Sequence, residues 1–335
     1  MDILAELFRD AGLAGRLLER RALSDDHGLR FPCDRSVGIH VVLAGSVWVH
    51  HAGLPSPLAL GPGDIAVMGR GCTHVLATRA QLDGLRIESV SVAAEAAPGG
   101  DAAAPQAVPT SPEVIAAEPS AALVVSGAYQ LWHTPVHPLF AELPAWYVHR
   151  ASPTPGLQPI ALAVGLLADE MNRDATERDG LGQQSVMHGL LDVLFTYLLR
   201  EIIASRGADG TGWSHAILDP QVRRAVALLH ADVARDWTLA ALAHAVGVSR
   251  SVLAARFRAH MGDTPLAYLR TVRLQRAMRL LVERDATLER IAAEVGYGDA
   301  FSFSKAFKRA VGMSPGEFRR RDASERGLAW RFAAG

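Results

Sequence analysis

One helix-turn-helix pattern occurs twice within residues 219–320, and this duplication constrains the fold of the 335-residue chain more than any other feature. The copies read LAALAHAVGVSRSVLAARF and LERIAAEVGYGDAFSFSKAF. In each copy an alanine precedes a glycine by four residues (Ala243 and Gly247, then Ala292 and Gly296). The small alanine lets two helices approach closely, and the glycine permits a sharp turn. The pattern therefore predicts two compact helical modules.

Residues that cap helix N-termini precede the expected helices of both modules. These N-caps are Thr238, Ser249, Thr287 and Asp299. Between the modules Thr264-Pro265 opens a long spacer helix, and Ser314-Pro315-Gly316-Glu317 has the form of a capping box. The second helices of the modules should bury Val252, Leu253 and Phe257, and then Phe303 and Phe307. Two such modules can place two recognition helices on one face of DNA.

Charge is divided unevenly along the chain. Residues 213–335 hold 20 Lys and Arg against 12 Asp and Glu, whereas residues 1–212 hold 14 against 23. The net formal charge of −1 therefore combines a basic C-terminal part with an acidic N-terminal part. Because a polyanion is attracted to the basic part, the charge pattern favours double-stranded DNA as a partner.

Residues 219–320 resemble the DNA-binding domain of the AraC/XylS transcription regulators. The family's hallmark run appears as Ile291-Ala292, Gly296-Tyr297, Phe303, Ala306-Phe307-Lys308-Arg309, Gly312 and Ser314-Pro315. The resemblance implies seven helices, two of which enter successive major grooves on one side of the duplex. It also implies a sequence-specific transcriptional regulator, with RNA polymerase as a further partner.

The family's groove-facing positions carry over to this chain residue by residue. They are Arg250, Ser251, Ala254 and Ala255 on the first recognition helix, and Ala300, Phe301, Ser302, Ser304 and Lys305 on the second. The two alanines of the first helix can contact thymine methyl groups but cannot form bidentate hydrogen bonds, so we expect this module to discriminate weakly. Phe301 is either a thymine contact or an extra core residue. The expected phosphate contacts are Arg256, Arg258, Lys308 and Arg309.

The N-terminal part of the chain has a different pattern. From residue 29 to about residue 92 short β-type runs alternate with turn residues, which predicts an all-β sheet or barrel. The spacing of Gly63, Gly69, Gly71 and His74 resembles the second motif of the cupin fold, with glycine at position 69 where proline is usual. This resemblance implies a cupin-like barrel.

The first cupin motif lacks its metal ligands in this sequence. Gly38 stands where a cupin enzyme carries a metal-binding glutamate, and the two histidine positions fall within residues 31–34, which hold no histidine. The candidate metal or effector residues that remain are His40, His74, Cys72 and Cys33, with Asp34 as a further ligand candidate. Three interpretations stay open: polar residues that line a small-molecule pocket, a redesigned site for zinc or a similar divalent metal ion, and a thiol pair that senses oxidants. No other cofactor is expected.

Residues 28–150 also resemble the sensor domain of one AraC-type subgroup. The resemblance rests on Ser126-Gly127-Ala128-Tyr129 and on His137-Pro138-Leu139-Phe140 with Leu143-Pro144. Some relatives carry cysteine where this chain has Ser126, which weakens a redox mechanism at that position. The Ala/Pro/Gly-rich residues 93–122 are expected to form a mobile loop.

Two amphipathic helices are expected between these parts, over residues 158–172 and 184–205. The second carries Leu191, Phe195 and Leu199 beside its main apolar stripe, which predicts pairing with a second subunit and a homodimer. Residues 208–212 are the expected linker. The expected fold class is α+β with two domains. A cupin-like β-barrel domain (1–150) is followed by helices and a linker (151–212) and by an all-α domain with two helix-turn-helix units (213–325).

The sequence thus favours a cytoplasmic DNA-binding regulator without enzymatic activity, whose cupin-like domain senses a small molecule, a metal ion or an oxidant. Neither a signal peptide nor an apolar stretch of about 20 residues is present, so no membrane association is expected. One alternative is a cupin metalloenzyme with an accessory DNA-binding domain, which the missing ligands disfavour. Another is a DNA-repair methyltransferase, whose Pro-Cys-His-Arg setting Pro32-Cys33-Asp34-Arg35 matches only in part.

Overall fold

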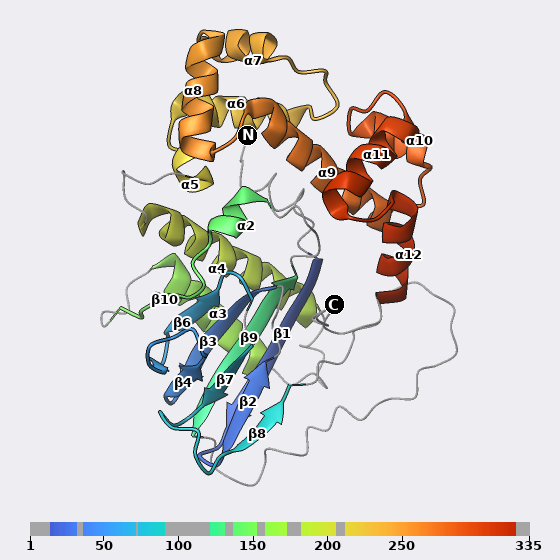
Figure 1. Cartoon of the computed structure of the whole chain (residues 1–335). Helices are drawn as coiled ribbons and strands as arrows, with labels where there is room; N and C mark the ends of the chain where they lie inside the picture. The colour runs from blue at the N-terminus through green and yellow to red at the C-terminus, as the bar shows by residue number, and fades with distance from the viewer. Residues whose placement is uncertain are drawn as a thin grey trace. The chain divides into compact units, whose positions relative to one another are not determined.

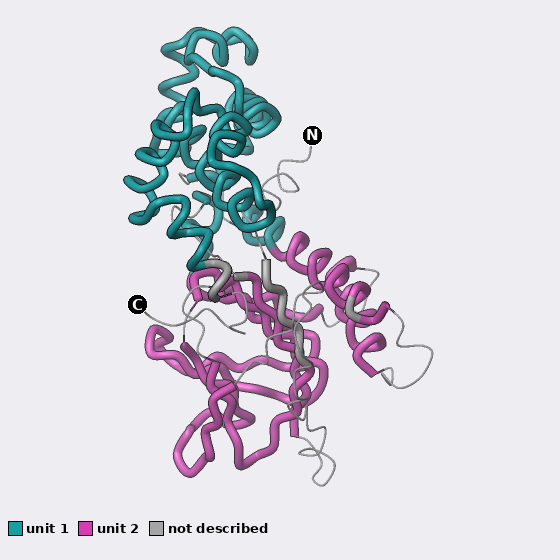
Figure 2. Tube along the Cα trace, turned by 90° about the vertical axis from the view of Figure 1, so that its right-hand side faces the viewer, with its two compact units in different colours: residues 1–14, 130–144, 199–325 teal, residues 15–129, 145–198, 326–335 magenta. Residues whose placement is uncertain are grey.

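The computed structural model describes residues 14–31, 36–71, 73–90, 121–130, 137–152, 158–172, 182–205 and 212–325 (Figure 1). The chain divides into two compact units (Figure 2). The sheet unit includes Gly15–Tyr129 and Ala145–Leu198, and the helical unit includes Gln130–Pro144 and Leu199–Glu325. The expected combination of a sheet-rich part and an all-helical part is confirmed.

The sheet unit contains two five-stranded sheets, with strand orders β1-β9-β3-β6-β10 and β5-β4-β7-β2-β8. The strands are β1 (Ala14–Leu23), β2 (His27–Phe31), β3 (Ser36–Ala44), β4 (Val47–His50), β5 (Leu58–Leu60), β6 (Ile65–Met68), β7 (His74–Ala77), β8 (Arg86–Ser89), β9 (Ala122–Gln130) and β10 (Tyr147–His149). Within the described residues no strand pair joins the two sheets into the closed barrel that the sequence suggested. The core between them includes Val42, Val49, Leu76 and Val124.

Gly38 on β3 has a structural reason to be glycine. It pairs with Met68 on β6, and a Cβ at this position would lie 2.1 Å from the Met68 Cε atom. The position where a cupin enzyme carries glutamate is therefore filled by a neighbouring methionine side chain. A glutamate here would require Met68 to move.

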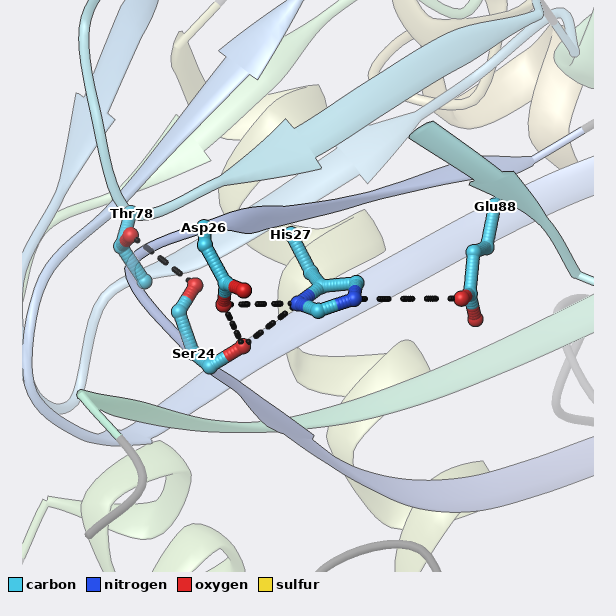
Figure 3. A network of polar contacts seen from close by, with 5 residues as sticks. All are labelled: Ser24, Asp26, His27, Thr78 and Glu88. Atoms are coloured by element: carbon cyan, nitrogen blue, oxygen red, sulfur yellow. Dashed lines mark hydrogen bonds and ion pairs between the residues drawn. The ribbon is translucent and has the colours of Figure 1, made fainter. Parts of the chain in front are cut away.

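A polar network fastens the turn between β1 and β2 to the neighbouring strands (Figure 3). The Ser24 hydroxyl donates to the Asp26 carboxylate at 2.7 Å, and His27 Nδ1 lies 2.7 Å from the same oxygen. The hydrogen bond from Ser24 and, to a smaller extent, the one with His27 hold the pKa of Asp26 below its ordinary value. The Thr78 hydroxyl donates to the Ser24 carbonyl, and His27 Nε2 lies 3.9 Å from Glu88. The network thus connects this turn to β8 and to the end of β7.

Two helices complete the described part of the sheet unit, α3 (Pro159–Asn172) and α4 (Gln183–Ser205, whose last turns belong to the helical unit). Both match the expected ranges. The expectation that the second apolar face of α4 pairs with another subunit is wrong for Leu191, Phe195 and Leu199, because all three are buried within the chain. The Phe195 ring stacks on Tyr129 of β9 at 4.4 Å. The sequence predicted that a second subunit covers this face of α4, because it does not show that β9 provides an apolar surface to cover it.

The helical unit contains α2 (Pro138–Glu142), α5 (Trp213–Ala216), α6 (Pro220–Ala231), α7 (Leu239–Val246), α8 (Arg250–Met261), α9 (Pro265–Glu283), α10 (Leu288–Glu294), α11 (Ala300–Val311) and α12 (Pro315–Glu325). The seven helices that the resemblance implied are α6 to α12. All predicted caps are present: Thr238, Ser249, Thr264, Thr287 and Asp299 each accept a hydrogen bond from a backbone N–H in the first turn. Ser314 and Glu317 form the predicted reciprocal capping box.

The two turn glycines act as predicted. Gly247 and Gly296 both have φ of +80°, in the left-handed region that favours glycine. At Gly296 a Cβ would also lie 2.7 Å from the Ala234 carbonyl oxygen. The turn of the second module therefore depends on glycine both for its backbone conformation and for its close approach to the loop between α6 and α7.

Some elements of the structure were not predicted, and two predicted segments lie largely outside the described residues. Strands β1 and β10 and the short helix α2 were not predicted. The expected mobile loop at 93–122 lies outside the described residues except at its end, where β9 begins, and of the expected linker only Gly212 is described. No helix in the described ranges is long and apolar enough to cross a membrane.

Candidate functional site

The first predicted recognition helix, α8, separates its residues into a buried and an exposed face. Leu253 and Phe257 are fully buried, whereas Arg250, Ser251 and Ala255 are exposed and Ala254 is half-buried. Val252, which the sequence assigned to the buried stripe, is 39% exposed. The prediction for Val252 is wrong. Leu253 and Phe257, one on each of two successive turns, form the buried face of α8, and Val252 lies beside that face.

The arginines of α8 differ in their contacts. Arg256 forms an ion pair with Asp219 at 3.1 Å and contacts Gln221, so its guanidinium links α8 to the N-terminus of α6. Arg258 is exposed and makes no ion pair with any described residue. Arg258 is therefore free to meet a phosphate, whereas Arg256 would have to share its donors between Asp219 and DNA.

The second predicted recognition helix, α11, shows the same separation more strongly. Phe303 and Phe307 are fully buried, whereas Phe301 is 79% exposed. Phe301 is therefore not an extra core residue. The remaining alternative is that its ring contacts a molecule outside the module. Ala300 and Ser304 are half-buried on the same helix.

The start of α11 is fixed by Asp299. Its carboxylate accepts a hydrogen bond from the Ser302 backbone N–H at 2.6 Å and another from the Ser302 hydroxyl at 2.8 Å. These two hydrogen bonds hold the pKa of Asp299 below its ordinary value. Because the hydroxyl proton of Ser302 is already donated, its oxygen can only accept a hydrogen bond from a base. Ser302 therefore acts first as part of the cap.

The basic residues of α11 lie on its exposed face. Lys305, Lys308 and Arg309 are exposed and form no ion pair within the described part of the chain. Phe301, Lys305 and Lys308 follow one another at spacings of four and three residues, which places them along one side of the helix. The exposed side of α11 thus combines an aromatic ring in the first turn with cations further along.

The helix α9 separates the two recognition helices (Figure 1). It begins at Pro265, shortly after α8, and ends at Glu283, before α10 and α11. At 1.5 Å per residue its 19 residues span about 28 Å, close to the roughly 34 Å between successive major grooves. The length of α9 is therefore comparable with the spacing of adjacent grooves.

In the sheet unit the structure brings together two of the candidate effector residues, His40 and His74. Their Nε2 atoms are 2.7 Å apart, and His40 Nδ1 lies 2.9 Å from the Ser126 hydroxyl on β9. Both rings are buried. Burial, and then the nearby His74 and Arg21, lower the pKa of His40 well below its ordinary value. The His40 ring is therefore neutral, and it lies within hydrogen-bond distance of His74. Cys33 and Cys72 lie outside the described residues.

The geometry of the histidine pair does not match a bound metal ion. Two imidazole ligands of tetrahedral zinc, each about 2.0–2.1 Å from the metal, have nitrogen atoms about 3.3 Å apart. The observed separation of 2.7 Å is instead that of a direct hydrogen bond. Among the described residues no group of three His, Cys, Asp or Glu side chains could hold a metal ion.

Two aromatic residues pack against His74 of the histidine pair. The Phe31 ring stacks on His74 at 5.1 Å, and Trp146 meets His74 edge-on at 5.3 Å. The indole N–H of Trp146 is buried and has no hydrogen-bond partner among the described residues. A buried N–H without a partner costs free energy, and a water or ligand molecule that reached it would relieve this cost.

A pocket of about 360 Å³ opens beside this cluster. Its lining includes His50, His51, Leu54, Thr73, His74 and Leu82. Its volume is within the range of small-molecule sites in proteins. Sequence reasoning did not identify His50, the last residue of β4, or His51, which follows it, because neither matches a motif.

Comparison with known proteins identifies both parts of the chain. Residues 2–204 match a family model described as Cupin, and residues 242–321 match one described as Helix-turn-helix domain. A putative AraC-like transcription regulator of Streptomyces lividans is 31% identical over 292 residues, which cover 87% of this chain and 89% of the relative. The chain belongs to the AraC-like transcription regulators. This AraC-like regulator is a DNA-binding protein with a cupin-type sensor domain.

Two further comparisons cover nearly all of the AraC-like regulator and about a third of it, respectively. The HTH-type transcriptional regulator MtrA of Neisseria gonorrhoeae is 25% identical over 324 residues, or 96% of this chain and 98% of the relative. The crystal structure of the DNA-binding domain of AdpA in complex with a target DNA has 28% sequence identity and a TM-score of 0.31. It covers 32% of this chain and 96% of that one.

The helical unit of this AraC-like regulator contains a buried polar cluster that the sequence did not reveal. The Tyr268 hydroxyl oxygen lies 2.9 Å from His137 Nε2, 2.8 Å from His230 Nε2 and 3.2 Å from Trp213 Nε1. Burial, and then the nearby His230, lower the pKa of His137 well below its ordinary value, so its ring is neutral. The Leu139 backbone N–H donates to His137 Nδ1, which places the ring proton on Nε2.

These contacts assign a direction to the three hydrogen bonds of the Tyr268 hydroxyl described above. His137 Nε2–H and Trp213 Nε1–H both donate to the Tyr268 oxygen, so the Tyr268 hydroxyl must donate to His230 Nε2. Glu142, at the end of α2, accepts hydrogen bonds from the backbone N–H groups of Trp213 and Ser214. Residues 137–144 thus pack as part of the DNA-binding unit, although they lie between two strands of the sensor in sequence.

Proposed function

We propose that α8 and α11 enter adjacent major grooves and recognise a specific DNA sequence. The base-contacting residues are those predicted from the sequence, with Arg250, Ser251, Ala254 and Ala255 on α8 and Ala300, Phe301, Ser302, Ser304 and Lys305 on α11. Arg258, Lys308 and Arg309 contact phosphates, and Arg256 does so from its ion pair with Asp219. The observation that carries the proposal is the exposed face of α11, where an aromatic ring and unpaired cations line one side of a well-capped helix.

Lys308→Ala is expected to weaken binding to all DNA sequences alike. Loss of one phosphate contact should flatten the slope of log affinity against log salt concentration by about 0.9. Titration of a labelled duplex at several salt concentrations measures this slope. The control is Arg284→Ala, which also removes one positive charge, but from a side chain paired with Glu294 at 3.3 Å. Equal slopes for the Lys308 variant and the wild type would contradict phosphate contact at Lys308.

In the sensor domain we propose a small organic molecule as the effector. The support is the pocket of about 360 Å³ and the His40–His74 distance, which suits a hydrogen bond better than a metal ion. The polar residues His50, His51 and Thr73 would orient the molecule by hydrogen bonds.

Metal and thiol analysis of the purified full chain tests this choice among effectors. We expect far less than one tightly bound metal ion per chain, and melting that does not change when a chelator is added. A full equivalent of zinc would instead favour the metal interpretation, with His40, His74, Cys72 and Cys33 as ligands. An oxidant-dependent change of DNA affinity that disappears without the two cysteines would favour the thiol interpretation.

The strand β9 offers a covalent route from the effector cluster to the DNA-binding unit. Ser126 on β9 contacts His40, and Tyr129 near the end of the strand donates to Asp192 of α4 at 2.8 Å. The chain then reaches His137, whose ring joins the cluster around Tyr268. We propose that an effector which shifts β9 changes residues 137–144 and thereby DNA binding. A coupling of about 1–3 kcal/mol is typical of such systems.

We also propose that this regulator forms a homodimer through α3 and α4. Leu162 and Leu166 of α3 are 48% and 56% exposed and lie four residues apart, while Val186 and Val193 of α4 are 46% and 44% exposed and lie seven apart. Each pair therefore occupies one face of its helix, and a second copy would cover these apolar faces. Sedimentation of the full chain tests this, since a single monomeric species at micromolar concentration would overturn it.

The activity we propose is regulation without enzymatic turnover, in the cytoplasm and with RNA polymerase as a partner on DNA. Two similar proteins from Streptomyces lividans and Streptomyces antibioticus are described as putative AraC-like transcription regulators. The alternative of a cupin metalloenzyme lacks support from the site, because Gly38 packs on Met68 where an enzyme would carry glutamate. In the network of Figure 3, Ser24 and Asp26 both contact the same nitrogen of His27, which is not the arrangement of a catalytic triad. Turnover by a stoichiometric iron or manganese form would revive the enzyme alternative.

A further inference from the structure

The exposed large apolar residues of the helical unit are few and unevenly placed. Among its described residues they are Leu218, Val252 and Phe301. Two of the three occupy the first turns of the recognition helices: Val252 is the third residue of α8, and Phe301 is the second residue of α11. The two modules thus present an apolar side chain at the same end of the corresponding helix.

The core of each module is filled by other side chains, with Phe301 largely outside it and Val252 partly outside it. In α8 the core is filled by Leu253 and Phe257, and in α11 by Phe303 and Phe307, each of them fully buried. Phe301 is 79% exposed, and Val252 is 39% exposed. Single exposed apolar side chains are common on protein surfaces, but these two lie in the first turns of the recognition helices, where contact with bases would cover them.

The surroundings of Phe301 indicate which surface covers it. Lys305 and Lys308 follow it along one side of α11, and Arg309 lies beside them. A partner that contacts the ring therefore also meets three positive charges, which suits a nucleic acid. In helix-turn-helix proteins the first turn of the recognition helix meets the edges of the bases.

The edges of the bases in the major groove carry one apolar group, the C5 methyl of thymine. We propose that Phe301 and Val252 are specificity-determining residues that recognise thymine methyl groups, one in each of two successive major grooves. The inference rests on the proposed docking of α8 and α11, and it adds the chemical class of base that each module selects. The cap at Asp299 supports it, because the Ser302 hydroxyl is occupied there and leaves the ring as the main base contact of the first turn.

Thymine and deoxyuridine differ only by this methyl group, so replacing one by the other tests the proposal directly. A binding site is first selected from a random duplex library with the full wild-type chain, and each thymine is then replaced singly by deoxyuridine. We expect a loss of about fourfold in affinity at one or two positions in each half of the site, the effect of one buried methyl group. Single replacement of a cytosine by 5-methylcytosine outside these positions should have no effect.

The variants assign each position to a side chain. Phe301→Ala should bind thymine and deoxyuridine equally in the half-site of the second module and keep the penalty in the other half, and Val252→Ala should do the reverse. Phe301→Leu should keep the penalty, because leucine also contacts a methyl group. Lys305→Ala is the control that weakens binding but leaves the penalty unchanged.

Two outcomes separate the possible failures. If Phe301→Ala shows the same penalties as the wild type while melting at the same temperature, the ring does not recognise the methyl group and the inference is wrong. If the wild-type chain enriches no sequence from the library, the proposed DNA recognition itself fails. Enrichment of sites without a thymine preference in either half would overturn the inference and leave the proposed function intact.

Discussion

Phe303→Ala is expected to unfold the second helix-turn-helix module and to abolish sequence-specific DNA binding. The Phe303 ring is fully buried, 5.6 Å from the ring of Phe307 and 5.5 Å from that of Tyr297. Removing a buried phenylalanine side chain costs about 3–5 kcal/mol, because the contacts are lost and a cavity remains. That amount is a large part of the about 5–15 kcal/mol by which a domain is stable. Thermal melting by circular dichroism and DNA titration measure both effects.

The same substitution two residues earlier provides a matched control. Phe301→Ala changes an identical side chain on the same helix, but one that is 79% exposed. We expect its melting temperature to stay within about 2 °C of the wild type, whereas Phe303→Ala should lower the transition of the helical unit by at least about 10 °C. Equal melting temperatures for the two variants would contradict the packing described for α11.

Tyr268→Phe is expected to have the second largest effect on stability. The change removes one oxygen atom, yet it takes a hydrogen-bond partner from His137, His230 and Trp213 at once. Each buried polar group that loses its partner costs about 1–3 kcal/mol, so we expect a loss of about 3 kcal/mol or more in the free energy of unfolding. Denaturant titration of the full chain, monitored by tryptophan fluorescence, measures this value.

Tyr297→Phe is the control for the loss of a hydroxyl group. Tyr297 is half-buried in the same unit, and its hydroxyl makes no hydrogen bond with a described residue. We expect its free energy of unfolding to change by less than about 0.5 kcal/mol. Similar losses in the two variants would mean that the hydroxyl at position 268 contributes little beyond its volume.

The helical modules could be predicted from the sequence because their signals are local. Each cap and each turn glycine acts within four residues of the chain, so Thr238, Asp299 and Gly296 were assigned correctly. The face assigned to Val252 was wrong because helical spacing alone does not define the width of a buried stripe. The exposure of Phe301 likewise had to come from the structure.

The sheet unit was less predictable, and for a physical reason. Strand β1 has the sequence AGRLLERRAL, whose leucines and arginines favour a helix, and its pairing with β9 outweighs this local preference. The pairing of His40 with His74 followed from motif spacing, but their direct hydrogen bond did not. The cluster around Tyr268 joins residues as many as 131 positions apart, so no local pattern could indicate it.

Residues 137–144 belong to the DNA-binding part, but in sequence they lie within the sensing part, so no single position in the gene separates the two parts. A C-terminal fragment that starts at residue 212 would lack the His137 donor to Tyr268 and the Glu142 acceptor for the start of α5. Chimeras that join a foreign sensor to such a fragment would inherit a weakened core. Exchange of sensors between related regulators, in the laboratory or by recombination, would therefore need this short insert to travel with the C-terminal half.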